Sequence, residues 1–126
     1  MKKKIFILGI LLAAGVLLSG CSPQENSGNT RLKVGVTLYD AGDTFLSAMM
    51  TSFKQDINDM ANDSTSVSVT IRDAESSQRK QNSDVEEFID EGCNVLCVNL
   101  VDRTAPSAII DMAKENDIPV IFFNRE

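Results

Sequence analysis

Residues 95–100 read V-L-C-V-N-L, a continuous apolar run interrupted only by Asn99. A short run of this kind is typical of a strand whose two faces are both covered by other parts of the protein. Such strands belong to parallel sheets, in which the connecting helices lie on both faces. This stretch therefore predicts an α/β protein, and the sequence on either side of it indicates how the sheet is built.

Two more strands and two helices are predicted on the N-terminal side of this run. Residues 32–38 and 67–71 alternate between apolar and polar side chains, which is typical of strands. Apolar residues recur with helical spacing over residues 45–61 and again over residues 78–91. Each predicted strand is thus followed by a predicted amphipathic helix.

Turn and cap residues mark the ends of these elements. Thr44 suits the N-cap of the first helix, and Gly92 suits the left-handed residue that follows the second. A third helix is predicted to open at residue 104 or 105 and to end near residue 116, before a strand over residues 120–123. The order βαβαβαβ predicts a Rossmann-like, doubly wound parallel sheet with right-handed crossovers.

The N-terminus is typical of an exported lipoprotein. Lys2, Lys3 and Lys4 precede an apolar stretch over residues 5–18 that is too short to be a good spanning helix. Leu18-Ser19-Gly20-Cys21 then matches the bacterial lipobox. We therefore expect a lipoprotein signal peptide over residues 1–20 and a lipidated Cys21, which holds the protein to the outer face of the cell membrane. The polar residues 21–31 are expected to form a flexible tether.

Charge and composition exclude several classes of function. The chain has a formal charge of −6, and leaving out the three lysines of the signal lowers the basic count from 12 to 9 against 18 acids, a charge of −9. A field of that sign repels phosphate, so we expect no nucleic-acid partner. Histidine is absent, which removes the commonest general base and the commonest zinc ligand.

Cys93 and Cys97 are predicted to be reduced packing residues. They lie four residues apart at the start of a predicted strand, where extended chain separates their Cα atoms by about 13 Å. A disulfide requires about 7 Å or less.

Polar and aromatic side chains follow the carboxyl ends of the predicted strands, where open parallel sheets bind their ligands. After the first strand come Tyr39, Asp43 and Phe45. An aromatic ring can cover the C–H face of a sugar, and a carboxylate can accept hydrogen bonds from its hydroxyls. The other strand ends are followed by Asp73, Asp102, Arg103, Asn124 and Arg125.

Four blocks of sequence carry a resemblance to a known family. They are T-R-L-K-V-G-V-T-L-Y-D-A-G-D-T-F (30–45), S-S-Q-R-K-Q-N-S-D-V (76–85), V-N-L-V-D (98–102) and I-P-V-I-F-F-N-R-E (118–126). In order and spacing they resemble the N-terminal lobe of the galactose/glucose (methyl-galactoside) binding proteins of bacterial ABC transporters, which are type I periplasmic binding proteins. Residues 32–126 would then be a partial N-terminal sugar-binding lobe, and the sequence a fragment that lacks the second lobe.

The resemblance also implies a site. Asp43 and Asn124 match the family's partners for sugar hydroxyls, and Phe45 matches its stacking ring. Tyr39 lines the pocket, and Arg125 takes the position of a family lysine beside the sugar. The family's calcium site lies outside the matched part, so we expect no metal or cofactor here.

The function implied is that of a lipid-anchored, extracytoplasmic binding protein that captures galactose or glucose and delivers it to an ABC permease. It would not be an enzyme. The alternatives are a sugar-sensing lipoprotein that feeds a chemoreceptor or histidine kinase, and a binder of another sugar such as ribose or xylose. A hydrolase that uses paired carboxylates also stays open on spacing alone, whereas the absence of G-x-G-x-x-G disfavours a nucleotide-dependent enzyme.

The residues themselves also permit plainer interpretations. Phe45 has helical spacing with Met49 and Phe53, so it could belong to the buried stripe of the first helix. Asp43 could be a capping acid, which is common before helices. Asn124 could be an ordinary turn residue.

Overall fold

A computed structural model of the chain describes residues 30–60 and 65–125. The predicted signal, Cys21 and most of the predicted tether lie outside these residues. Within them, four strands and three helices alternate along the chain, as predicted. They are β1 (Thr30–Leu38), α1 (Thr44–Met60), β2 (Thr65–Asp73), α2 (Gln78–Asp90), β3 (Val95–Val98), α3 (Ser107–Glu115) and β4 (Val120–Phe122).

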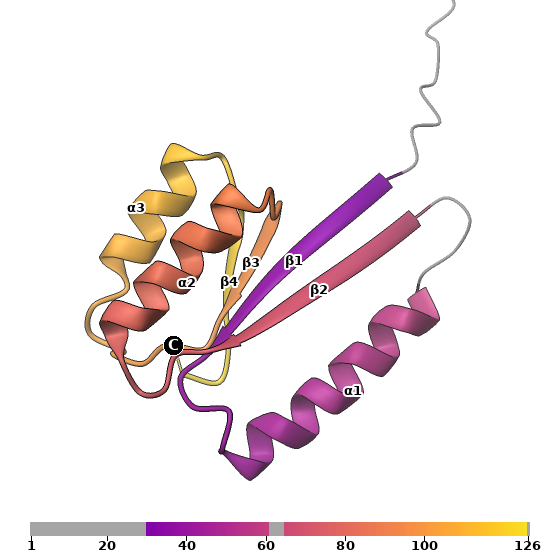
Figure 1. The fold of residues 1–126 in the computed structure, drawn as a ribbon, viewed down its shortest axis with the longest axis horizontal. Helices are drawn as coiled ribbons and strands as arrows, with labels where there is room; N and C mark the ends of the chain where they lie inside the picture. Colours follow the sequence, from indigo (N-terminus) through magenta and orange to yellow (C-terminus); the bar gives the residue numbers. More distant parts are fainter. Residues whose placement is uncertain (1–29, 61–64, 126) are drawn as a thin grey trace, which may run out of the picture.

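The strands form one parallel sheet in the order β2-β1-β3-β4, which confirms the predicted fold class. In this register Val36 of β1 lies between Ile71 of β2 and Cys97 of β3. Helices α2 and α3 lie on one face of the sheet, and α1 lies on the other (Figure 1). All four strands therefore end at the same edge, at the bottom of the view in Figure 1.

Close packing between β1 and α2 forms the centre of the core. Phe88 of α2 is fully buried, and its ring lies directly over Gly35. A Cβ on Gly35 would lie 2.5 Å from the ring, so a larger residue cannot be accommodated without a shift. Glycine in the middle of β1 is thus what lets α2 approach the sheet.

Helix α1 turns most of its predicted apolar stripe toward the core, but not the two residues at the ends of that stripe. Its buried residues are Leu46 and Met50, which pack against β1, whereas Phe45 is 61% exposed and Met60 is 68% exposed. Neighbouring residues on a helix point about 100° apart, so a stripe centred on Leu46 turns Phe45 away from the core. The interpretation of Phe45 as a core residue is therefore wrong.

The structure also shows the residue that ends α2, the two cysteines and the start of α3. Gly92 has φ +77°, which confirms the left-handed residue after α2. Cys93 and Cys97 are both free, the first buried and the second half-buried. Helix α3 starts at Ser107, two to three residues later than predicted, because Asp102 and Thr104 form a turn before it. No helix among the described residues is long and apolar enough to cross a membrane.

Candidate functional site

The residues predicted to bind a ligand lie at the carboxyl edge of the sheet. Tyr39 and Asp43 are in the loop between β1 and α1, Phe45 is in the first turn of α1, and Asn124 and Arg125 follow β4. Because β1 and β4 are both parallel neighbours of β3, the two segments leave the sheet at the same end. Residues 123–125, which follow β4, therefore lie at this edge.

Asp43 is the cap of helix α1. Its Oδ1 accepts hydrogen bonds from the backbone N–H groups of Phe45 at 2.8 Å and Leu46 at 3.1 Å. These are two of the amide groups that a helix N-terminus leaves without an intrahelical partner. The predicted N-cap Thr44 is therefore wrong by one residue, and the capping role considered for Asp43 is present.

The second oxygen of Asp43 bonds an aromatic side chain. Tyr39 donates its phenolic O–H to Asp43 Oδ2, with 2.7 Å between the oxygens. This bond is the main reason that the pKa of Asp43 lies below its ordinary value, and the helix amides lower the pKa further. The same bond raises the pKa of Tyr39, because ionising the phenol would remove the donor and place two negative charges together. Asp43 is thus held as a carboxylate and Tyr39 as a neutral phenol.

Arg125 completes a cluster with these two residues. Its guanidinium lies over the ring of Tyr39, with Cζ 4.2 Å from the ring centroid, in cation–π geometry. It also donates to the carbonyl oxygen of Val101 at 3.2 Å. The structure therefore brings together Tyr39, Asp43 and Arg125, which come from opposite ends of the described chain.

Asn124 occupies a tight turn beside this cluster. Its φ of +60° is in the left-handed region, which asparagine adopts more readily than most residues. The backbone N–H of Arg125 bonds the carbonyl of Phe123 across it at 2.6 Å. The interpretation of Asn124 as a turn residue is therefore correct for its backbone, while its side chain stays exposed at the edge of the site.

Most other acids of this edge hold the loops in shape. Asp40 accepts from Gly42, and Asp73 accepts from Ala41 and Glu75. Asp102 accepts from the backbone and hydroxyl of Thr104, which lowers its pKa. These bonds give the carboxylates local structural roles.

The chemistry available at the edge is that of hydrogen bonding and stacking. Each carboxylate oxygen can accept more than one bond, so Asp43 Oδ2 keeps acceptor capacity beyond the one from Tyr39. Arg125 carries donors beyond the one that reaches Val101. The side chain of Phe45, whose backbone N–H bonds Asp43, is an exposed apolar ring. Together these groups suit a ligand that carries both hydroxyls and C–H faces.

Two residues that support the site were not singled out from the sequence. Asn99 and Gln81 are both fully buried, and they hydrogen-bond the backbone at the ends of β1, β3 and β4. In the sequence, Asn99 stands out only as the polar residue that interrupts the apolar run at residues 95–100. Nothing in the helical pattern marks Gln81.

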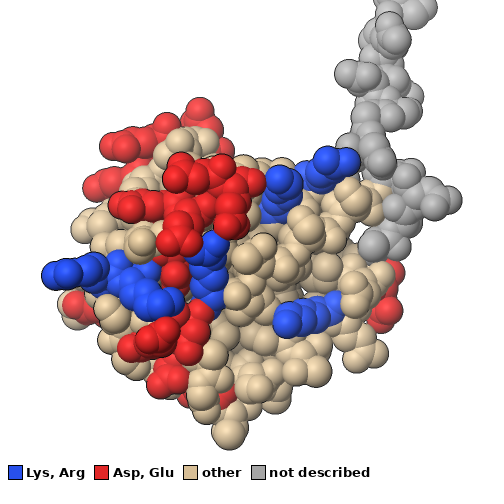
Figure 2. Space-filling model, viewed as in Figure 1, with Lys and Arg blue, Asp and Glu red and all other residues tan. Residues whose placement is uncertain are grey.

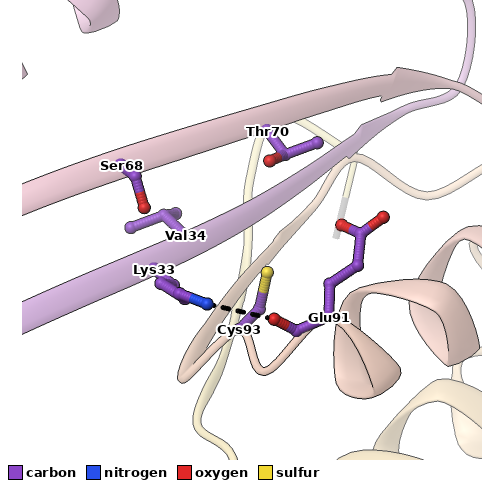
Figure 3. A pocket seen from close by; sticks show the side chains of 6 residues that line it. All are labelled: Lys33, Val34, Ser68, Thr70, Glu91 and Cys93. Atoms are coloured by element: carbon purple, nitrogen blue, oxygen red, sulfur yellow. Dashed lines mark hydrogen bonds between the residues drawn. The ribbon is translucent and has the colours of Figure 1, made fainter.

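A shallow groove lies away from these residues, where α2 ends beside β1 and β2 (Figure 3). It has a volume of about 160 Å³ and is lined by Lys33, Val34, Ser68, Thr70, Glu91 and Cys93. The ammonium of Lys33 is bonded to the carbonyl of Glu91 at 3.2 Å, and burial raises the pKa of the Cys93 thiol. None of the predicted ligand-binding residues lines this groove.

Acidic side chains gather where α2 and α3 end (Figure 2). Some of this charge is compensated, because Arg72 pairs with Glu87 and Glu91 while lying over the ring of Phe88. Among the described residues, no three acids or cysteines are grouped so that they could hold a metal ion.

Comparison with known proteins places these features in a family. Residues 34–126 match the model of the periplasmic binding protein domain. The chain is 34% identical over 124 residues to the D-galactose/methyl-galactoside binding periplasmic protein of Haemophilus influenzae, covering 98% of this chain and 35% of that protein. It is 32% identical over 133 residues to the ribose import binding protein of Bacillus subtilis, covering 99% and 41%.

A solved structure of a solute-binding protein is also similar to this chain. The fold is similar to an ABC transporter solute binding protein from Bacillus halodurans with bound myo-inositol, at a TM-score of 0.63 and 26% identity, covering 81% of this chain and 33% of that one. The chain spans well under half the length of the curated relatives it matches.

Proposed function

Because the chain belongs to the periplasmic binding protein domain family, we propose that it forms the N-terminal lobe of an exported solute-binding protein that captures a monosaccharide for an ABC permease. The observation that supports this most is the cluster of Tyr39, Asp43 and Arg125 beside the exposed ring of Phe45. A carboxylate acceptor, guanidinium donors and an apolar ring are what a sugar requires from one side of a pocket.

In this proposal Asp43 accepts hydrogen bonds from sugar hydroxyls through Oδ2, and Phe45 covers a C–H face. Asn124 adds an amide at the edge, and Arg125 lies beside the sugar. Tyr39 lines the site and holds the carboxylate. Binding is reversible and involves no covalent chemistry, so we propose a binding protein and not an enzyme.

The lobe is proposed to work with a second lobe that covers the sugar. The site lies open at the edge of the sheet, and a hydrogen bond open to water contributes only about 0.5–1.5 kcal/mol. The described residues alone should therefore bind sugars weakly. Closure by a second lobe would exclude water and strengthen each bond.

The preferred ligand is proposed to be galactose or glucose. The galactoside-binding relative has the highest identity of the relatives described above. Ribose is the alternative that the Bacillus subtilis relative favours, and the myo-inositol complex extends the range to cyclic polyols. All of these ligands carry hydroxyls and C–H faces, so the same side chains would serve each of them.

We further propose that lipid on Cys21 anchors the protein to the outer face of the cell membrane. The residues between Cys21 and β1 would then act as the tether. This arrangement keeps the sugar-binding lobe near a permease in the same membrane.

The test compares two substitutions of Asp43 in the protein expressed from its complete reading frame. Asp43→Asn keeps a good helix cap but replaces the charged acceptor, whereas Asp43→Ala removes both. We expect Asp43→Asn to weaken galactose or glucose binding by about ten- to a hundred-fold, because bonds to a charged group contribute about 1.5–3 kcal/mol. Calorimetric titration with galactose, glucose, ribose and myo-inositol measures this.

The unliganded melting temperature serves as the control. Asp43→Asn should melt closer to the wild type than Asp43→Ala, because only Asp43→Ala loses the helix cap. Unchanged sugar affinity in Asp43→Asn would remove Asp43 from the site. A wild-type protein that binds none of the four ligands would refute the proposed function.

A further inference from the structure

We propose that Asn99 is the positioning residue of this site, because its one side chain holds the two segments that carry the ligand-binding residues. This inference rests on the proposed function for its importance, but its structural claim can be tested without a sugar. Asn99 follows β3, the strand between β1 and β4, and its side chain is fully buried. Both of the hydrogen bonds described below for its side chain reach backbone atoms.

The amide of Asn99 makes one hydrogen bond to each segment. Its Oδ1 accepts from the backbone N–H of Tyr39 at 3.3 Å, and its Nδ2 donates to the carbonyl of Phe123 at 3.0 Å. The first bond fixes the start of the loop that contains Asp43. The second fixes the end of β4, directly before Asn124.

Both bonds act on atoms next to the site. Tyr39 is hydrogen-bonded to Asp43 through its phenol, with 2.7 Å between the oxygens, so fixing Tyr39 also restrains Asp43. The carbonyl of Phe123 also accepts the N–H of Arg125, so it closes the tight turn in which Asn124 has φ +60°. One buried amide therefore sets the distance between the two halves of the site.

Asn99 is in turn held by helix α2. Gln81 donates through Nε2 to the carbonyl of Asn99 at 2.9 Å, and its Oε1 accepts from the N–H of Val101 at 2.9 Å. The carbonyl of Val101 accepts from Arg125. Gln81 thus holds the short stretch after β3 that contains Asn99, and Arg125 is hydrogen-bonded to the same stretch.

The amide side chain of Asn99 has the donor and the acceptor that these two bonds require. Asparagine offers a donor and an acceptor on one planar group, whereas leucine of similar size offers neither. With leucine at position 99, the part-buried N–H of Tyr39 would lose its Asn99 partner and the Phe123 carbonyl would lose one of its bonds, which is costly for groups shielded from water. We expect the two segments to separate or to become mobile.

The chain contains a control at Asn94, whose side chain makes the same pair of bonds but is exposed, whereas that of Asn99 is buried. Its Oδ1 accepts from the N–H of Lys33 at 2.9 Å and its Nδ2 donates to the carbonyl of Arg31 at 2.9 Å. This bridge has the same chemistry as that of Asn99. It lies at the amino end of β1 and β3, away from the candidate site.

The experiment compares Asn99→Leu and Asn94→Leu by amide NMR and hydrogen exchange on the chain, and by sugar titration of the protein from its complete reading frame. We expect Asn99→Leu to accelerate exchange at Tyr39 and to shift the amide signals of residues 39–45 and 123–125. Sugar affinity should fall by about tenfold, as expected if roughly 1.4 kcal/mol is lost. Asn94→Leu should leave those signals and the affinity within about twofold of wild type.

If Asn99→Leu does not fold, Asn99→Ser is used, because its smaller side chain leaves room for water at the two backbone groups. Unchanged signals in residues 39–45 and 123–125 with a folded Asn99 variant would overturn the inference, whether or not sugar binds. Equal loss of affinity in the Asn94 and Asn99 variants would also overturn it, since the effect would then be general destabilisation. Shifted signals in a protein that binds no sugar would instead count against the proposed function alone.

Discussion

Asp43 has two structural roles, one for each oxygen of its carboxylate. Oδ1 caps α1 through two backbone amides, and Oδ2 accepts from Tyr39. Both sets of bonds favour the ionised form, so the side chain is fixed in orientation and charge before any ligand arrives. A fixed acceptor loses little entropy on binding, which is the physical reason for expecting this residue to contribute to affinity.

Tyr39→Phe tests the phenol–carboxylate bond. Removing the hydroxyl takes away the largest cause of the lowered pKa, so the pKa of Asp43 should rise toward its ordinary value. A carbon-13 titration of the carboxyl groups measures this, and Asp102 serves as the internal control because its pKa is set by Thr104. An Asp43 pKa that stays where it is in the wild type would contradict the assignment.

Acid should weaken the fold through the same residue. The folded pKa of Asp43 lies below its unfolded pKa, so its contribution to stability is complete above the unfolded value and is lost as the pH falls through the folded value. Denaturant unfolding at neutral and acidic pH measures the free energy of unfolding. Asp43→Asn should lose less stability over that pH range than the wild type, and equal losses would show that Asp43 does not contribute.

At the scale of elements, the packing of α2 on β1 depends on Gly35. Gly35→Ala should lower the free energy of unfolding by about 1–3 kcal/mol, because the added methyl would overlap the ring of Phe88. Urea unfolding measures the change. Gly42→Ala is the control, since a Cβ there would meet only the carboxylate tip of Asp40, and an equal loss in both variants would contradict the packing argument.

The elements also show what the sequence could predict. The order of strands and helices followed from periodicity, because period-two and helical patterns are set by burial on the faces of each element. Four matched blocks led to the family, which the comparisons confirm. The burial of Phe45 stayed open from the sequence, since Phe45 and Leu46 are adjacent apolar residues and only packing against β1 decides between them.

The site was predicted less completely than the fold. Its residues were expected at the carboxyl ends of strands, and the structure puts Tyr39, Asp43 and Arg125 in contact there. The bridge through Asn99 could not be predicted, because it joins segments far apart in sequence through backbone atoms that leave no pattern. The capping role of Asp43 was open from the sequence, since the neighbouring Thr44 is also a favourable capping residue type.

At the scale of the whole molecule, the face of the sheet opposite α2 and α3 carries exposed apolar surface. Ile121 of β4 is 55% exposed on this face, and Cys97 and Phe123 are half-buried beside it. Such surface near the edge of a sheet favours association. We predict that the 126-residue chain self-associates as its concentration rises, and that Ile121→Lys reduces this association.

Light scattering over a concentration series measures the effect. Met60→Lys is the control, because Met60 is a comparably exposed apolar residue on α1. Association that is unchanged by Ile121→Lys, or reduced equally by both variants, would count against a specific role for β4.

The central claim is that the carboxyl edge of the sheet, around Tyr39, Asp43, Phe45, Asn124 and Arg125, binds a monosaccharide. Chemical-shift mapping tests it most directly, with the isotope-labelled protein from its complete reading frame titrated with galactose and glucose. We predict saturable shifts in residues 39–45 and 123–125, with no change at Lys33, Ser68 and Cys93 in the groove of Figure 3. Saturable shifts confined to that groove, or none in residues 39–45 and 123–125 while the sugar binds, would contradict the account.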